Sequence, residues 1–212
     1  GTLSTLNLYG GTIIGGEATS THGGAICVAG GTMNMYGGEI KDCVSVKGGA
    51  IQLQAGKLNI YDGTICGSTA PVAAEGGAIY AENKAVIVQY GGTIVGGTAN
   101  ADGNYEGHNV AVFGGAFYMN GNVVIGDADK DGHSLYLFNT TSVEMVKGTI
   151  TGKVLARGAN FELKSELIVD ALSLRDTAIT AVEERNSSEQ IIIKVTNGAG
   201  ATLTGEFTSA LT

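Results

Sequence analysis

Three aspartates in the middle of the sequence have a spacing that could hold a metal ion. The segment GDADKDG places carboxylates at Asp127, Asp129 and Asp131, followed by Gly132. This is how a calcium-binding loop begins, because alternate carboxylates can converge on one hard cation. The glutamate that completes such a loop is absent, since Phe138 stands at the twelfth position. Aspartate and glycine also form ordinary turns, so two interpretations stay open: a Ca²⁺ site, or a turn without a metal.

A second candidate consists of tyrosines that recur at matching positions of a repeated segment. Tyr9, Tyr36 and Tyr61 end the stretches LNLY, MNMY and LNIY, which places them in one outward column if the segments stack. Exposed tyrosines offer a flat apolar ring and a hydroxyl, so such a row could pack against sugar rings. Any stacked repeat also aligns like residues, so the row could be a mere consequence of the repeat. In the next copy we expect Gln89 in this column, with Tyr90 displaced by a one-residue bulge.

The repeated segment is marked by the tetrapeptide GGAI, which occurs at residues 23–26, 48–51 and 76–79. Degenerate copies begin at Gly107 and Gly132, so the period is about 25–31 residues. Within each copy apolar residues alternate with polar or small ones, the pattern of strands with one buried face. This predicts three short strands per copy, with glycine pairs at the sharp corners between them.

Stacking these copies on one another describes an all-β protein, a single-stranded parallel β-helix or β-solenoid with three short strands per turn. We expect residues 1–152 to form the repeats, with Val86 and Val88 pointing inward in the third copy. Residues 153–212 lose the glycine pairs and are expected to form irregular final turns or a C-terminal β cap of the same solenoid. A short helix is expected near residues 171–181.

Composition argues against several classes of function. Net charge is −8 and lysine and arginine do not cluster, so we expect no nucleic-acid partner, which needs a basic surface. No apolar run approaches the ~20 residues of a membrane-spanning helix, so no membrane insertion of this segment is expected. The three cysteines lack C-x-x-C spacing and are expected to be reduced. Outward carboxylates are sparse and no catalytic triad pattern appears, which favours a non-catalytic role.

Insertions between copies concentrate at one corner of the predicted turn, where the loops carry Tyr105 and Glu106. Variable loops along one edge of a solenoid commonly form binding sites. We therefore expect a ligand to contact this edge or the tyrosine row, through Tyr9, Tyr36, Tyr61, Tyr105 and Glu106. The alternative is that the loop residues are simply solvated.

The GGAI repeats, together with GGTI at the third strand, resemble the right-handed parallel β-helix repeats of bacterial surface proteins. They are similar to the large repeat proteins of gut anaerobes and, more distantly, to the passenger regions of polymorphic outer-membrane autotransporters. The resemblance covers residues 1–152. It implies a right-handed solenoid, an extracellular or cell-surface location, and a stalk or adhesin role with a polysaccharide or a host surface glycoprotein as partner. A polysaccharide-cleaving β-helix and a filament module that self-associates end to end stay open as alternatives.

Overall fold

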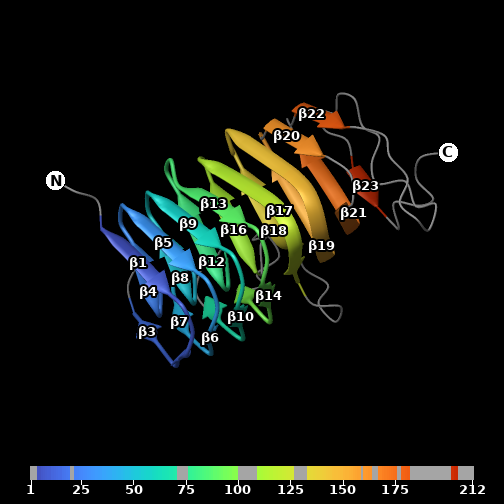
Figure 1. Ribbon diagram of the computed structural model, residues 1–212. Helices are drawn as coiled ribbons and strands as arrows, with labels where there is room; N and C mark the ends of the chain where they lie inside the picture. Colours follow the sequence, from blue (N-terminus) through green and yellow to red (C-terminus); the bar gives the residue numbers. More distant parts are fainter. Residues whose placement is uncertain are drawn as a thin grey trace.

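The structure, a computed structural model, describes residues 4–19, 22–70, 76–99, 109–126, 133–158, 160–163, 167–175, 178–181 and 202–204. Within these residues the protein is all β, and parallel strands stack as a β-solenoid of about 5 turns, which confirms the predicted fold class. The strands follow one another along a rod, from the blue N-terminal turns to the orange C-terminal ones (Figure 1). The described part of the chain has no helix that is long and apolar enough to cross a membrane.

The N-terminal turns each contribute three strands to one continuous sheet. The first ladder contains β4 (Ile26–Val28), β8 (Ile51–Leu53) and β12 (Ile79–Glu82). The second ladder contains β1 (Thr5–Leu8), β5 (Thr32–Met35), β9 (Lys57–Ile60) and β13 (Val86–Gln89). The third ladder contains β2 (Thr12–Ile14), β6 (Glu39–Lys41), β10 (Thr64–Cys66) and β14 (Thr93–Val95). Every strand pairs in parallel with its equivalent one turn later, so equivalent residues of successive copies form columns along the rod.

A fourth, smaller ladder lies at the corner before each GGAI segment. It consists of β3 (Glu17–Ala18), β7 (Val44–Ser45), β11 (Thr69–Ala70) and β15 (Thr98–Ala99), which form a separate four-stranded parallel sheet. The sequence does not predict this ladder, because two-residue strands are too short to show an alternating pattern. It closes the corner at which the sequence predicts only loops.

The later turns have longer, unbroken strands, and the last of them contain fewer residues. Strand β17 (Ala116–Ile125) covers the second and third ladders without a break, and β19 (Ser142–Arg157) continues into the first ladder of the next turn. Phe161 follows its partner Val143 by 18 residues, whereas Leu58 follows its partner Met33 by 25. The other strands here are β16 (Val110–Phe113), β18 (His133–Phe138), β20 (Asn160–Leu163), β21 (Leu167–Arg175), β22 (Ala178–Ala181) and β23 (Thr202–Thr204).

The short helix predicted near residues 171–181 is wrong. Residues 171–175 belong to β21, and β22 covers residues 178–181. Leu172 pairs with Val154 and Leu174 with Ala156, two inward columns of the first ladder. The leucines therefore follow the period of two that suits a strand, and pairing with the preceding turn overrides the local composition.

The GGAI tetrapeptide recurs because backbones meet at this corner too closely for a side chain. A Cβ on Gly49 would lie 2.6 Å from the backbone nitrogen of Thr69 in β11 and would overlap the carbonyl oxygen of Gly77. The next residues continue the ladder, since the amide of Ala25 donates to the carbonyl of Ala50 and that of Ala50 to the carbonyl of Ala78, both at 3.0 Å. In the turns that carry GGAI, only glycine fits this position without displacing the neighbouring turn.

Inside the rod, apolar side chains fill columns along the axis, and the predicted orientation of one strand, β13, is wrong. Ile87 pairs with Leu58 and is fully buried, whereas Val88 pairs with Asn59 and Val86 with Lys57 in outward columns. Val86 and Val88 therefore do not point inward. The segment from Ala85 to Val88 is apolar at every position, so its alternation can be read in either phase, and the register with β9 decides between them.

Candidate functional site

Four tyrosines form a continuous stack along the second ladder. Tyr9, Tyr36, Tyr61 and Tyr90 directly follow β1, β5, β9 and β13. Neighbouring ring centroids lie 5.1, 4.8 and 5.0 Å apart, and neighbouring planes are inclined by only 6–8°. This spacing is close to the distance between adjacent strands. In-register parallel pairing places each tyrosine directly above the equivalent tyrosine of the preceding turn. We call these four residues the tyrosine ladder.

The predicted place of Gln89 and Tyr90 is wrong. Gln89 pairs with Ile60 in an inward column and is fully buried, while Tyr90 stacks on Tyr61. The extra residue of the third copy lies before β13 rather than after it. There β12 is one residue longer than β8, and Asn83 makes the corner with a left-handed φ of 60°. Its side-chain amide donates to the carbonyl of Gln54, 2.9 Å away in the preceding turn, which restores the register.

The tyrosine ladder is exposed, and its hydroxyl groups bind no other described residue. Tyr9 is 73% exposed, and Tyr36, Tyr61 and Tyr90 are 40–41% exposed. None of the four hydroxyls hydrogen-bonds to a residue that the structure describes. Tyr36 and Tyr61 each have a ring on both sides, so their faces contact their neighbours. The groups left to meet a ligand are the ring edges and the hydroxyls.

An asparagine column runs beside the tyrosine ladder on the same face. The side-chain amide of Asn34 donates to the side-chain oxygen of Asn7 at 2.8 Å, and Asn59 donates to Asn34 at 2.7 Å. The column ends at Val88, where the Oδ1 atom of Asn59 is buried and has no hydrogen-bond partner in the part of the chain that the structure describes. These bonds tie successive turns together and hold the base of the tyrosine ladder in register.

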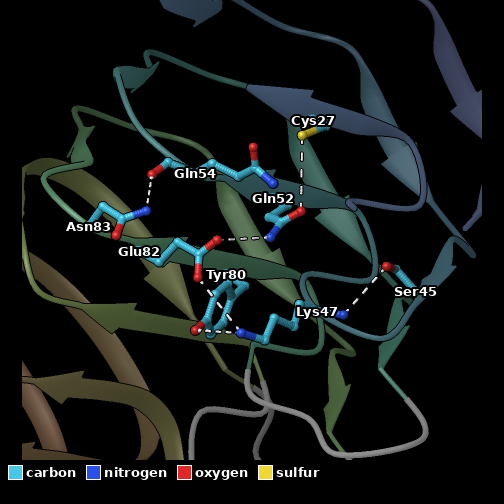
Figure 2. Close-up of polar contacts among 8 residues, drawn as sticks. All are labelled: Cys27, Ser45, Lys47, Gln52, Gln54, Tyr80, Glu82 and Asn83. Atoms are coloured by element: carbon cyan, nitrogen blue, oxygen red, sulfur yellow. Dashed lines mark hydrogen bonds and ion pairs between the residues drawn. The ribbon is translucent and has the colours of Figure 1, made fainter. Parts of the chain in front are cut away.

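A second polar cluster, which the sequence does not predict, lies on the outward side of the first ladder. Figure 2 shows Lys47 pointing toward Tyr80 and Glu82, with its Nζ atom 3.1 Å from the Tyr80 hydroxyl and 3.7 Å from the Glu82 carboxylate. The amide of Gln52 donates to the other Glu82 oxygen at 3.2 Å. Burial raises the pKa of the Cys27 thiol beside Gln52, and the charge of Glu82 adds to the rise. Lys47 and Glu82 thus neutralise each other, Gln52 adds a hydrogen bond to Glu82, and the raised pKa keeps the Cys27 thiol protonated near neutral pH.

A smaller charged group lies on the third ladder. The ammonium group of Lys41 lies 2.8 Å from the Glu39 carboxylate, and this hydrogen bond lowers the pKa of Glu39 and raises that of Lys41. The Cys66 thiol donates to Glu39, and burial together with the Glu39 charge raises its pKa. All three cysteines, Cys27, Cys43 and Cys66, are free. Over the described residues no group of three or more His, Cys, Asp or Glu side chains could hold a metal ion.

The predicted site residues fall into two sets. Tyr9, Tyr36 and Tyr61 belong to one surface, which Tyr90 extends. The other predicted residues lie outside the part of the chain that the structure describes: Tyr105, Glu106, Asp127, Asp129 and Asp131. The calcium site and the loop-edge site therefore stay predictions.

Comparisons with known proteins find no relative of this chain, so its class rests on the fold alone. No protein-family model, curated protein or solved structure matches this chain. The chain is an all-β protein of the parallel β-solenoid class, built from about 5 turns.

Proposed function

We propose that this chain is a rigid module of an extracellular or cell-surface protein, a stalk or adhesin whose tyrosine ladder binds a carbohydrate. The observation that carries the proposal is the stack of four aligned tyrosines, 40–73% exposed, whose hydroxyls have no partner among the described residues. The resemblance of the GGAI repeats to those of bacterial surface proteins supports the location.

The chemistry of this surface suits sugars better than other partners. Phenol hydroxyls can donate to and accept from sugar hydroxyls, while the ring edges can pack against sugar C–H groups. Asn7 and Asn34 add amide groups beside the rings. A net charge of −8 disfavours nucleic acids, which need a basic surface.

The solenoid contributes rigidity and repetition. Equivalent ladder positions of successive turns are fixed by parallel pairing, so weak contacts repeat along the rod at constant spacing. Several weak contacts that form together bind more tightly than any one alone, because later contacts are intramolecular. A long ligand can therefore bind well even if each tyrosine contributes little.

The proposal is tested with a panel of glycans and plant polysaccharides. We expect saturable binding that the double substitution Tyr36→Ala/Tyr61→Ala abolishes. Thr64→Ala/Thr93→Ala, a pair of equally repeated side chains on the third ladder, serves as the matched control and should bind normally. Circular dichroism of both variants checks the fold. If the wild-type protein binds no member of the panel, the proposal is contradicted. Release of reducing ends would favour the polysaccharide-cleaving alternative.

The loop residues enter the same experiment through a chelator. If Asp127, Asp129 and Asp131 hold Ca²⁺ that supports the binding edge near Tyr105 and Glu106, removing calcium lowers affinity for the panel. Binding that survives the chelator leaves the tyrosine ladder as the only proposed surface.

A further inference from the structure

The tyrosine ladder has a direction and a period, and both restrict what can bind to it. Its rings repeat every 4.8–5.1 Å along the rod, at right angles to the strands. Building on the proposed function, we propose that the ligand is a neutral, extended, β-1,4-linked glycan chain that lies parallel to the solenoid axis, with one sugar unit per turn.

The period carries the choice of an extended chain. In an extended β-1,4-linked glycan, successive pyranose rings advance by a distance close to the strand spacing of about 4.8 Å. Adjacent sugars of such a chain are flipped relative to one another, so each tyrosine meets one sugar, with Tyr9 and Tyr61 facing one edge of the chain pattern and Tyr36 and Tyr90 facing the other. A chain that crosses the rod along a strand would meet one tyrosine only. A curved α-1,4-linked chain would leave the straight row after a short contact.

The geometry of the rings decides the kind of contact. Each inner ring is nearly parallel to both neighbours at about stacking distance, so a sugar cannot insert against its face. The hydroxyls carry the interaction instead, because each can donate one hydrogen bond and accept another. Replacing tyrosine by phenylalanine should therefore weaken binding while leaving the stack intact.

The number of aligned rings sets the length of the site. Four tyrosines stack in register from Tyr9 to Tyr90. In the following turn Met119 pairs with Gln89, and the residue after Met119 is Asn120, where the register of β17 shifts. The ladder thus offers four equivalent positions for successive sugar units.

Charge favours a neutral chain over an acidic one. The protein carries a net charge of −8, and Asp62 is exposed directly after Tyr61. Lys57 is the only cation in the outward columns of β1, β5, β9 and β13. A polymer of uronic acids would need more positive charge than this described face supplies.

The test is calorimetric titration with cello-oligosaccharides of two to six glucose units. We expect the affinity to rise several-fold with each unit up to four, and to change little for five or six units. Malto-oligosaccharides contain the same sugar in a curved chain and should bind at least tenfold more weakly. The double substitution Tyr36→Phe/Tyr61→Phe should lower the affinity for the four-unit ligand about tenfold, because two hydrogen bonds are lost. Its unfolding transition should match that of the wild-type protein.

Different failures point to different errors. Equal affinity for two and six units, or for cello- and malto-oligosaccharides, would overturn the axial arrangement but leave carbohydrate binding intact. Undiminished binding by the phenylalanine variant would overturn the role of the hydroxyls. If no oligosaccharide binds but a member of the polysaccharide panel does, the proposed β-1,4-linked ligand class is wrong. If no member of the panel binds either, the proposed function is also wrong.

Discussion

At the scale of single residues, Gln89 is the most unusual member of the core. It lies in an inward column between Ile60 and Met119 and is fully buried. Among the described residues its Oε1 atom has no hydrogen-bond partner, and its amide makes only a long contact of 3.5 Å with the carbonyl of Gly92. An unpaired amide oxygen in such a place costs about 1–3 kcal/mol.

We expect Gln89→Leu to stabilise the protein. The substitution removes the unpaired oxygen and matches the apolar neighbours, so the free energy of unfolding should rise by about 1–2 kcal/mol. Urea denaturation followed by circular dichroism measures this change. Gln52→Leu is the matched control, because the Gln52 side chain is buried but hydrogen-bonded to Glu82, and its loss should not stabilise. A Gln89→Leu variant no more stable than wild type would contradict the interpretation.

The second glycine of GGAI gives a prediction of opposite sign. Gly49→Ala forces a Cβ against backbone atoms of Thr69 and Gly77, so at least one turn must shift. The free energy of unfolding should fall by about 3 kcal/mol. Gly10→Ala is the control, since a Cβ there meets no atom within 4 Å and the loss should stay below about 1 kcal/mol. Thermal melts of the two variants side by side would show the difference, and equal melts would contradict the close-approach explanation.

At the scale of elements, the tyrosine ladder also stabilises the rod. Tyr61 stacks on two rings and Tyr9 on one. Each stacked pair contributes about 0.5–1.5 kcal/mol, so Tyr61→Ala should cost about twice as much as Tyr9→Ala. Chemical denaturation of both variants measures the ratio, with Tyr61→Phe as a control that keeps the stack. Equal losses for the two alanine variants would mean that the rings do not act as one ladder.

Much of this architecture could be predicted from sequence, because repetition amplifies the weak signal of each short strand. The column of Tyr9, Tyr36 and Tyr61 follows from three motifs of the same pattern, LNLY, MNMY and LNIY. Tyr90 could not be assigned, because the extra residue of its copy is absorbed before β13, where four consecutive apolar residues hide the register.

Contacts that are not repeated from turn to turn could not be predicted from the sequence. Lys47, Tyr80 and Glu82 come from two different turns, and no other described turn repeats all three of them, so no pattern indicates that they meet. The fourth ladder could not be predicted for another reason, because its strands contain only two residues each. Features of the fold that depend on alternation and period can be predicted from the sequence, whereas single contacts across turns are seen only in the structure.

At the scale of the whole molecule, one turn is the unit of construction. Removing residues 48–75 joins Lys47 to Gly76, so one GGAI segment replaces another and all ladders keep their register. We expect this variant to fold cooperatively with a β-sheet circular dichroism spectrum and a smaller denaturant m-value, because less surface is buried. Removing residues 48–61 deletes only part of a turn and should prevent cooperative folding. A half-turn variant as stable as the full-turn variant would contradict the modular interpretation.

The same whole-turn deletion tests the central claim that each turn is also one binding position. It leaves Tyr9, Tyr36 and Tyr90 in line, a ladder of three rings in place of four. The decisive measurement is the affinity of this variant for cello-oligosaccharides of two to six units, compared with the wild-type protein. We predict that affinity stops rising at three units in the variant and at four in the wild type. A plateau at the same length in both proteins would contradict one sugar unit per turn.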